Sequence, residues 1–330
     1  MQSHGDLPWL EDARNLLGHM ASEERVAPAL LIRGPSGTGK THLARVYAQR
    51  LLCRSPIGID PCQRCVSCLL FMAGTHPDYQ FIAPEEPGKP IKIEAIRRMI
   101  QSISLAPQYG GYRAILIDEA DALNGSAANA LLKTLEEPPE GTLLILVTDR
   151  PELLPATVRS RLRSITIRMP ERDLVLAWLA AMGCSEQDRE PLLNAASGSP
   201  LGALALDAPE VLRRRLQCFE EFLRVFEGLD DPLQIAESWL SGNLDLELEW
   251  LAGWFRDLSC LAMGSGLASV FNRDLEEGYG VIIKHSSARF LMESYGRVIE
   301  MKSAMLGPAN KQLILEGFLL SWAGPHSLVA

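Results

Sequence analysis

The sequence predicts a doubly wound α/β domain in its first half and helices alone in the rest. Short apolar runs alternate with segments of helical spacing up to residue 168, and the runs 29–33 and 143–147 are almost entirely apolar. Strands buried on both faces of a parallel sheet have this continuous apolar character. A glycine-rich turn follows the first run, and helical spacing dominates from Pro170 onward. Alternating strands and helices build a parallel sheet that binds its ligands at the carboxyl ends of the strands.

The individual elements follow from the spacing of apolar residues. We expect a short amphipathic helix over 10–20 and strands at 29–33, 79–82, 114–117, 143–147 and 164–168. Helices are expected over 43–52, from 93 toward Pro107, and over 126–137, where two prolines stop the helix. The predicted domains are an α/β domain over 1–168, a small helical bundle over 169–207 and a helical domain over 208–330. In the last domain only 281–283 is a candidate strand.

The composition is that of an ordinary globular protein of two or three domains. The chain has 330 residues, of which 47% are hydrophobic and 22% are charged. No apolar stretch is long enough to span a membrane, and the first residues lack the layout of a secretory signal. We therefore expect a cytoplasmic protein without a membrane partner. The net charge of −9 disfavours a protein that coats nucleic acid by itself, because phosphate affinity needs a clustered basic face.

The glycine-rich turn has the pattern of a phosphate-binding loop, G-x-x-x-x-G-K-[ST], between a strand and a helix. Backbone N–H groups of such a loop bind phosphate oxygens, while the lysine meets the β- and γ-phosphates and the Thr hydroxyl holds Mg²⁺. A glycine-rich turn that binds nothing is the alternative. The loop consists of Gly34, Pro35, Ser36, Gly37, Thr38, Gly39, Lys40 and Thr41.

An acidic pair follows the apolar run at 114–117. Asp118 is a candidate for holding Mg²⁺, directly or through water, and Glu119 is a candidate for orienting or deprotonating the attacking water. The alternative is an acidic turn after a core strand. With the upstream loop, the pair predicts a site for ATP and Mg²⁺.

Four of the seven cysteines crowd into residues 53–68 with the spacing C-x8-C-x2-C-x2-C. They are Cys53, Cys62, Cys65 and Cys68. In a reducing compartment such clustering favours a metal over disulfides, and four thiolates suit a closed, structural Zn²⁺ site. An iron–sulfur cluster and a redox dithiol are the alternatives.

Several motifs resemble those of bacterial DNA polymerase III clamp-loader subunits. The stretch 129–139, the four-cysteine module and the Ser160–Arg161–Leu162 triplet are all similar to that family, and the resemblance extends over essentially the whole chain. It implies an AAA+ domain with a helical lid and a C-terminal helical collar that oligomerises. The segments 7–10 and 73–79 resemble the delta-prime subunits, the rigid stators of the loader, rather than the gamma/tau motor.

The resemblance also implies partners and a reaction context. The partners are gamma/tau and delta subunits in a hetero-pentameric ring, which places a sliding clamp on primed DNA during replication. The chain would belong to the polymerase holoenzyme, a nucleotidyltransferase, although it has no carboxylate constellation for polymerase chemistry of its own. An ATPase motor of the gamma/tau type and a zinc-containing nucleic-acid-binding protein are the alternatives.

Residue roles come from the same resemblance. In the family, the arginine at position 161 reaches into the ATP site of a neighbouring subunit and acts in trans; a solvated surface arginine is the alternative. Leu201 falls where AAA+ motors carry a sensor-2 arginine, so the site would bind ATP and cleave it poorly. The sensor-1 position falls at Thr148 or Asp149, and the sequence leaves both open.

Overall fold

The chain folds into two compact units, residues 1–174 and 175–330, and each is described by itself. The computed structural model describes residues 7–23, 26–86, 88–103, 106–109, 111–206, 208–266, 269–305 and 309–324. Each unit has its own hydrophobic core.

The first unit is built on a five-stranded, fully parallel sheet with the order β2-β3-β4-β1-β5. The strands are β1 (Ala29–Arg33), β2 (Tyr79–Ile82), β3 (Arg113–Ile117), β4 (Thr142–Thr148) and β5 (Arg163–Thr166). The predicted fold class is confirmed, and each predicted strand lies within two residues of an observed one. The central strands β3 and β4 are buried along their whole length, as the apolar runs predicted.

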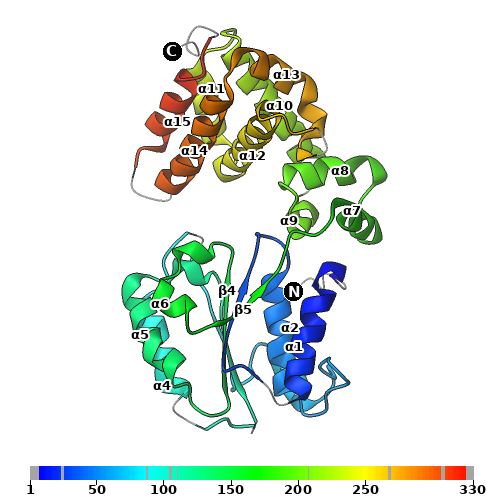
Figure 1. The fold of residues 1–330 in the computed structure, drawn as a ribbon, viewed down its shortest axis with the longest axis vertical. Helices are drawn as coiled ribbons and strands as arrows, with labels where there is room; N and C mark the ends of the chain where they lie inside the picture. The colour runs from blue at the N-terminus through cyan, green and yellow to red at the C-terminus, as the bar shows by residue number, and fades with distance from the viewer. Residues whose placement is uncertain are drawn as a thin grey trace. The chain divides into compact units, whose positions relative to one another are not determined.

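Helices cover both faces of this sheet (Figure 1). On one face lie α1 (Glu11–Ser22), preceded by η1 (Pro8–Leu10), and α2 (Lys40–Leu52). On the other lie α4 (Ile93–Ile103) and α5 (Gly125–Glu136), whose buried side chains, such as Ile96 and Leu131, pack on β3 and β4. The remaining short helices are α3 (Val66–Met72), η2 (Ala120–Ala122), η3 (Pro151–Leu153) and α6 (Ala156–Arg159).

The second unit is helical. Its first helices correspond to the predicted small bundle: α7 (Arg172–Ala181), within which the boundary between the units falls, α8 (Glu186–Ala195) and α9 (Pro200–Ala205). The later helices are α10 (Ala208–Phe226), α11 (Pro232–Ser241), α12 (Leu244–Ala262), η5 (Arg273–Leu275), α13 (Glu276–His285), α14 (Ala288–Met305) and α15 (Lys311–Leu320). Both sets of helices belong to one compact unit, so the finer division at residue 207 stays a prediction.

Aromatic side chains fill the core of the second unit. Trp239, Trp254 and Trp322 are completely buried among the later helices. The indole N–H of Trp250 donates to the carbonyl oxygen of Ala195 at 3.0 Å, which ties α12 to the end of α8. The candidate strand at 281–283 is wrong, because these residues lie in α13, where Tyr279 and Ile282 are buried three positions apart on one helix face.

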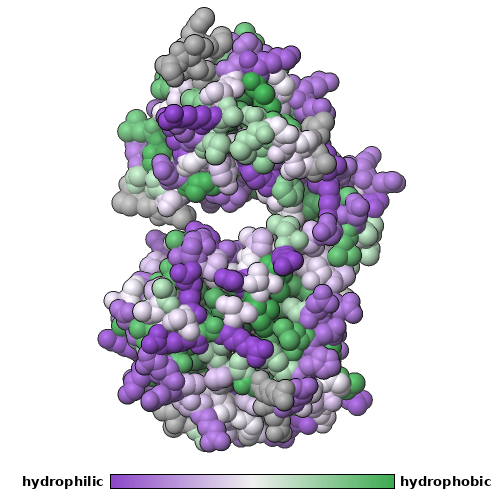
Figure 2. All heavy atoms as spheres, in the orientation of Figure 1, coloured by the Kyte–Doolittle hydropathy of each residue, from purple (hydrophilic) through white to green (hydrophobic). Residues whose placement is uncertain are grey.

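On the visible surface of each unit, hydrophobic areas lie among more extensive hydrophilic ones (Figure 2). Among the described residues, no helix is both long enough and apolar enough to cross a lipid bilayer.

Candidate nucleotide site and metal centre

The phosphate-binding loop runs from the end of β1 to the start of α2, as its sequence pattern predicts. A Cβ atom at Gly34 would lie 2.1 Å from the carbonyl oxygen of Ile167, so this position accepts no side chain. Gly39 caps α2 with a φ of 86°, a left-handed conformation that glycine adopts without strain. The indole N–H of Trp9 donates to the carbonyl oxygen of Thr38 at 2.8 Å and fixes the loop from outside. No spacing rule links residue 9 to the loop, and sequence reasoning missed this contact.

Lys40 is the first residue of α2, and its ammonium group is held by oxygen atoms of the chain itself. Its Nζ donates to the carbonyl oxygen of Pro35 at 2.6 Å and forms an ion pair with Oδ1 of Asp149 at 2.5 Å. The Lys40 side chain is only 4% exposed, whereas that of Asp149 is 44% exposed. The cation expected to meet phosphate therefore has an anionic partner at the carboxyl end of β4.

The predicted magnesium ligands are brought together. The Thr41 hydroxyl donates to both carboxylate oxygens of Asp118, at 2.9 and 3.0 Å. Hydroxyl and carboxylate oxygens are suitable ligands for Mg²⁺, so these residues fit the ion that accompanies a nucleotide. Burial raises the pKa of Asp118, with a smaller contribution from the charge of Asp149.

Glu119 directly follows Asp118 and is exposed. Its φ of 46° places a non-glycine residue in the left-handed region, which is uncommon and turns the chain sharply after β3. Burial raises the pKa of Glu119, and the negative charges of Asp118, Asp121 and Asp149 raise it further. The end of β3 is thus an acidic region, in which Lys40 and Arg150 are cationic partners of Asp149 and Asp121.

The two residues left open for the sensor-1 position differ in their contacts. Asp149 pairs with Lys40, whereas the Thr148 hydroxyl donates to Oδ1 of Asp121 at 2.7 Å and accepts from the backbone N–H of Arg150. Arg150 in turn donates from Nε to Asp121 at 2.9 Å. Of the two side chains, that of Asp149 contacts the phosphate-binding loop, through Lys40.

Arg161 lies just after α6, with its side chain 33% exposed. Two nitrogens of its guanidinium, Nε and Nη2, donate to Oε1 of Glu136 at 2.9 and 2.5 Å. A third, Nη1, donates to the carbonyl oxygen of Thr157 at 2.7 Å. Glu136 stands at the end of α5, in the stretch that resembles the clamp-loader signature, but sequence reasoning gave it no role.

The four clustered cysteines converge on one point. Their sulfur atoms all lie within 4.8 Å of one another, and the pairs Cys53–Cys65 and Cys62–Cys68 are each 4.0 Å apart. A tetrahedral Zn²⁺ with bonds of about 2.3 Å needs sulfur atoms roughly 3.8 Å apart. The donor set and its spacing therefore fit a closed metal site.

Backbone N–H groups stabilise negative charge on these sulfurs. The N–H groups of Cys62, Cys65 and Cys68 lie 3.2, 3.4 and 3.4 Å from the sulfurs of Cys53, Cys62 and Cys65. Burial alone would raise the pKa of Cys65, but hydrogen bonds, chiefly from the Cys68 N–H, lower it to about 6. Backbone hydrogen bonds lower the pKa of Cys62 as well, whereas burial raises the pKa of Cys53 and Cys68. A metal needs all four ligands as thiolates, so its binding would displace the protons of these last two.

His76 follows the module, but the contacts of its ring nitrogens are with Ser67 and Asp78 rather than with the four cysteines. Its Nδ1 accepts from the backbone N–H of Asp78 at 3.0 Å, and its Nε2 lies 2.9 Å from the hydroxyl of Ser67. Because that hydroxyl donates to the carbonyl oxygen of Leu52, Nε2 must carry the proton. The ring is therefore neutral, in agreement with a pKa lowered by burial.

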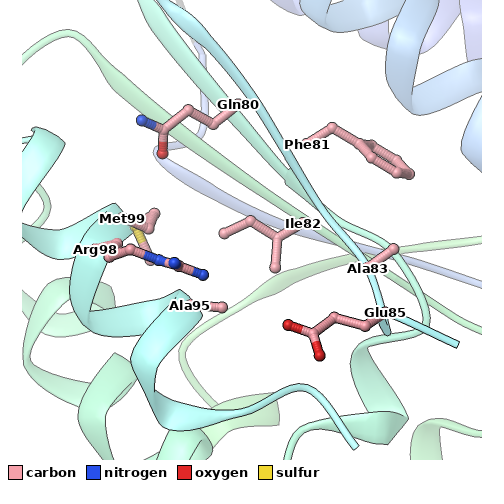
Figure 3. A pocket seen from close by; sticks show the side chains of 8 residues that line it. All are labelled: Gln80, Phe81, Ile82, Ala83, Glu85, Ala95, Arg98 and Met99. Atoms are coloured by element: carbon pink, nitrogen blue, oxygen red, sulfur yellow. The ribbon is translucent and has the colours of Figure 1, made fainter. Parts of the chain in front are cut away.

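A separate pocket of about 360 Å³ lies between the edge strand β2 and α4. Figure 3 shows Gln80 and Ile82 pointing toward α4, while Phe81 points to the other side of the strand. Strands β3 and β4 separate β2 from β1 and its phosphate-binding loop. This pocket is not part of the predicted nucleotide site.

A parallel sheet of this order, with a phosphate-binding loop after β1 and an acidic pair after β3, defines an AAA+ domain of the P-loop class. Residues 9–171 match the family described as DNA polymerase III, delta subunit, and residues 209–324 match its C-terminal family. The DNA polymerase III subunit delta' of Pseudomonas aeruginosa is 33% identical, covering 96% of this chain and 97% of the relative. The subunit delta' of Escherichia coli is 32% identical, covering 95% of this chain and 94% of the relative.

The chain belongs to the delta' family of DNA polymerase III subunits. It is also related to the tau subunit. The tau subunit of Escherichia coli is 33% identical over 73% of this chain and 39% of its own length.

Proposed function

We propose that this chain is the stator of a DNA polymerase III clamp loader. It would assemble with gamma/tau and delta subunits in a hetero-pentameric ring in the cytoplasm, and help that ring place a sliding clamp on primed DNA. Support comes from relatives named delta' that align over nearly their full lengths. The polymerase reaction itself belongs to other subunits of the holoenzyme.

The observation that carries the mechanism is the state of Arg161. Its hydrogen bonds go to Glu136, Thr157 and Ser160, none of which belongs to the phosphate-binding loop, and a third of its side chain is exposed. We infer that its guanidinium serves the ATP site of an adjoining subunit. An arginine supplied in trans stabilises the charge that spreads over phosphate oxygens in the transition state.

The chain's own site is proposed to bind a nucleotide with Mg²⁺ and to cleave it poorly. The loop residues 34–41 would cradle the phosphates, Lys40 would neutralise them, and Thr41 and Asp118 would hold the ion. Glu119 would orient a water. Leu201, in α9, stands at the position where the resemblance expects an arginine, so one cation for the transition state is missing.

The cysteine module is proposed to hold one structural Zn²⁺. The four sulfur ligands leave no open position for a substrate, which argues against a catalytic metal. The role of the ion would be to fold the segment between α2 and α3, which has few other buried apolar contacts.

The test of the stator role is Arg161→Ala in a reconstituted loader. An arginine finger contributes about 10³–10⁵ in rate, so turnover at the site that Arg161 serves should almost vanish while the ring still assembles. Arg159→Ala is the matched control, because this exposed arginine lies two residues earlier in the same segment. Unchanged ATPase of the complex would refute the role in trans. Brisk hydrolysis by the isolated chain would instead favour an ATPase motor.

A further inference from the structure

Asp149 contacts the lysine that would meet the β- and γ-phosphates of a nucleotide. In the sheet, Thr148 of β4 is level with Arg33 of β1, and the Gly34 N–H donates to the Thr148 carbonyl oxygen at 3.4 Å. Asp149 is therefore level with the first residue of the phosphate-binding loop. From there its Oδ1 reaches the Lys40 ammonium at 2.5 Å.

The lysine is left with little capacity for a further anion. An ammonium group has three donors. At Lys40 one is used by the Pro35 carbonyl oxygen and one by Asp149, in a site where the side chain is almost wholly shielded from water. Asp149 itself is 44% exposed, so water partly screens the pair, but a phosphate oxygen still has to compete with this carboxylate for the lysine. One donor remains for a phosphate oxygen.

The surrounding charges act against a third phosphate group. Asp118 and Glu119 stand at the end of the neighbouring strand β3, and the charge of Asp149 contributes to the raised pKa of each. A lysine of this loop normally contacts both β- and γ-phosphates. A γ-phosphate here would compete with Asp149 for Lys40 and add negative charge to a region already rich in carboxylates.

We propose that Asp149 is a built-in substitute for the γ-phosphate, which makes this site selective for a nucleoside diphosphate over a triphosphate. The β-phosphate keeps the remaining Lys40 donor and the backbone N–H groups of the loop. The carboxylate keeps the position that a γ-phosphate would need. This inference rests on the proposed binding of a nucleotide and specifies which one the stator holds.

The test is the ratio of dissociation constants for ATP and ADP, each with Mg²⁺, measured by calorimetry on the full chain. The wild-type chain should bind ADP about tenfold more tightly than ATP, on the scale of like-charge repulsion at a half-exposed carboxylate. Asp149→Asn keeps the shape of the side chain and removes its charge. We expect it to tighten ATP binding by about tenfold or more and ADP binding by less, so that the preference disappears.

Glu152→Gln is the matched control, because it removes the same charge three residues away, on the exposed helix η3, without contacting Lys40. Its ATP/ADP ratio should equal that of the wild type. Equal or tighter binding of ATP by the wild type would overturn the inference, as would an Asp149→Asn ratio that does not change. If none of the three proteins binds either nucleotide, this inference and the proposed nucleotide binding both fail. The stator role would still be decided separately by Arg161→Ala.

Discussion

The two ends of helix α2 carry two sites with opposite demands. Gly39 caps its amino end and Lys40 begins the helix, at the predicted phosphate-binding site. Cys53 caps its carboxyl end and contributes one of the four sulfurs of the predicted metal site. The helix dipole favours an anion at the first end, whereas a Zn²⁺ bound by four thiolates would carry a net negative charge and gain nothing from the second.

The two sites differ in whether the chain itself supplies a group of opposite charge. At the amino end the chain supplies its own counter-ion, because Asp149 neutralises Lys40. At the carboxyl end the sulfurs face one another, and the described polar contacts to them are backbone N–H groups at 3.2 to 3.4 Å. We therefore expect the proposed Zn²⁺ to matter more for the folding of the cysteine module than a nucleotide matters for the folding of the phosphate-binding loop.

Metal removal should therefore have the largest effect on stability. Structural Zn²⁺ sites contribute most of the folding free energy of small modules. Loss of several kcal/mol, at about 2–4 °C for each kcal/mol, lowers the melting temperature by roughly 10 °C or more. We expect this from Cys68→Ser or from a strong chelator, with elemental analysis giving one zinc for each wild-type chain. Cys260→Ser, in α12 outside the cluster, is the control. A metal-free chain with the wild-type melting temperature would contradict the dependence.

Lys40→Ala should have a large effect on binding and a small one on stability. Loss of a charged donor to phosphate weakens nucleotide binding by about 100-fold. The unpaired Asp149 is nearly half exposed and can be solvated, so the free energy of unfolding should fall by no more than about 1–2 kcal/mol. Calorimetry of binding and urea unfolding measure the two quantities. In the reconstituted loader the variant should retain the ATPase that Arg161→Ala removes. A loss of stability as large as that of the metal-free chain would contradict the expected difference between the two ends of α2.

Much of the first unit could be predicted because its signals are local. The apolar runs gave the strands, and the loop pattern gave the position of Lys40 and Thr41 at the start of α2. The spacing of the cysteines gave a cluster whose sulfurs do converge. In each case the chemistry is encoded within about a dozen neighbouring residues or by the period of one element.

The remaining features depend on tertiary contacts that no local pattern encodes. Thr148 and Asp149 are adjacent at the end of a strand, and only the packed structure shows which of them meets Lys40. Glu136, at the end of α5, and Arg161, just after α6, are 25 residues apart in the sequence. The β-branched run at 281–283 resembled a strand locally, but the packing of α13 in the second core decided in favour of a helix.

The smallest effect should come from Asp118→Asn, which probes the excess of carboxylates at the amino end of α2. Burial raises the pKa of Asp118 in the folded chain, so folding favours its protonated form. Its contribution to stability is therefore present at acidic pH and is lost as the pH rises through the folded-state pKa. At neutral pH the ionised group costs free energy, while asparagine would still accept from the Thr41 hydroxyl.

Asp118→Asn should accordingly stabilise the ligand-free chain at neutral pH by up to about 1 kcal/mol, with the gain shrinking in acid. Urea unfolding at the two pH values measures it. Asp121→Asn serves as the opposite control: Asp121 pairs with Arg150 and accepts from Thr148, so its neutralisation should destabilise the chain. A loss of stability in Asp118→Asn at neutral pH would mean that the carboxylates at this end are balanced without a nucleotide. The Lys40–Asp149 pair would then not be the dominant charge contact of the ligand-free site.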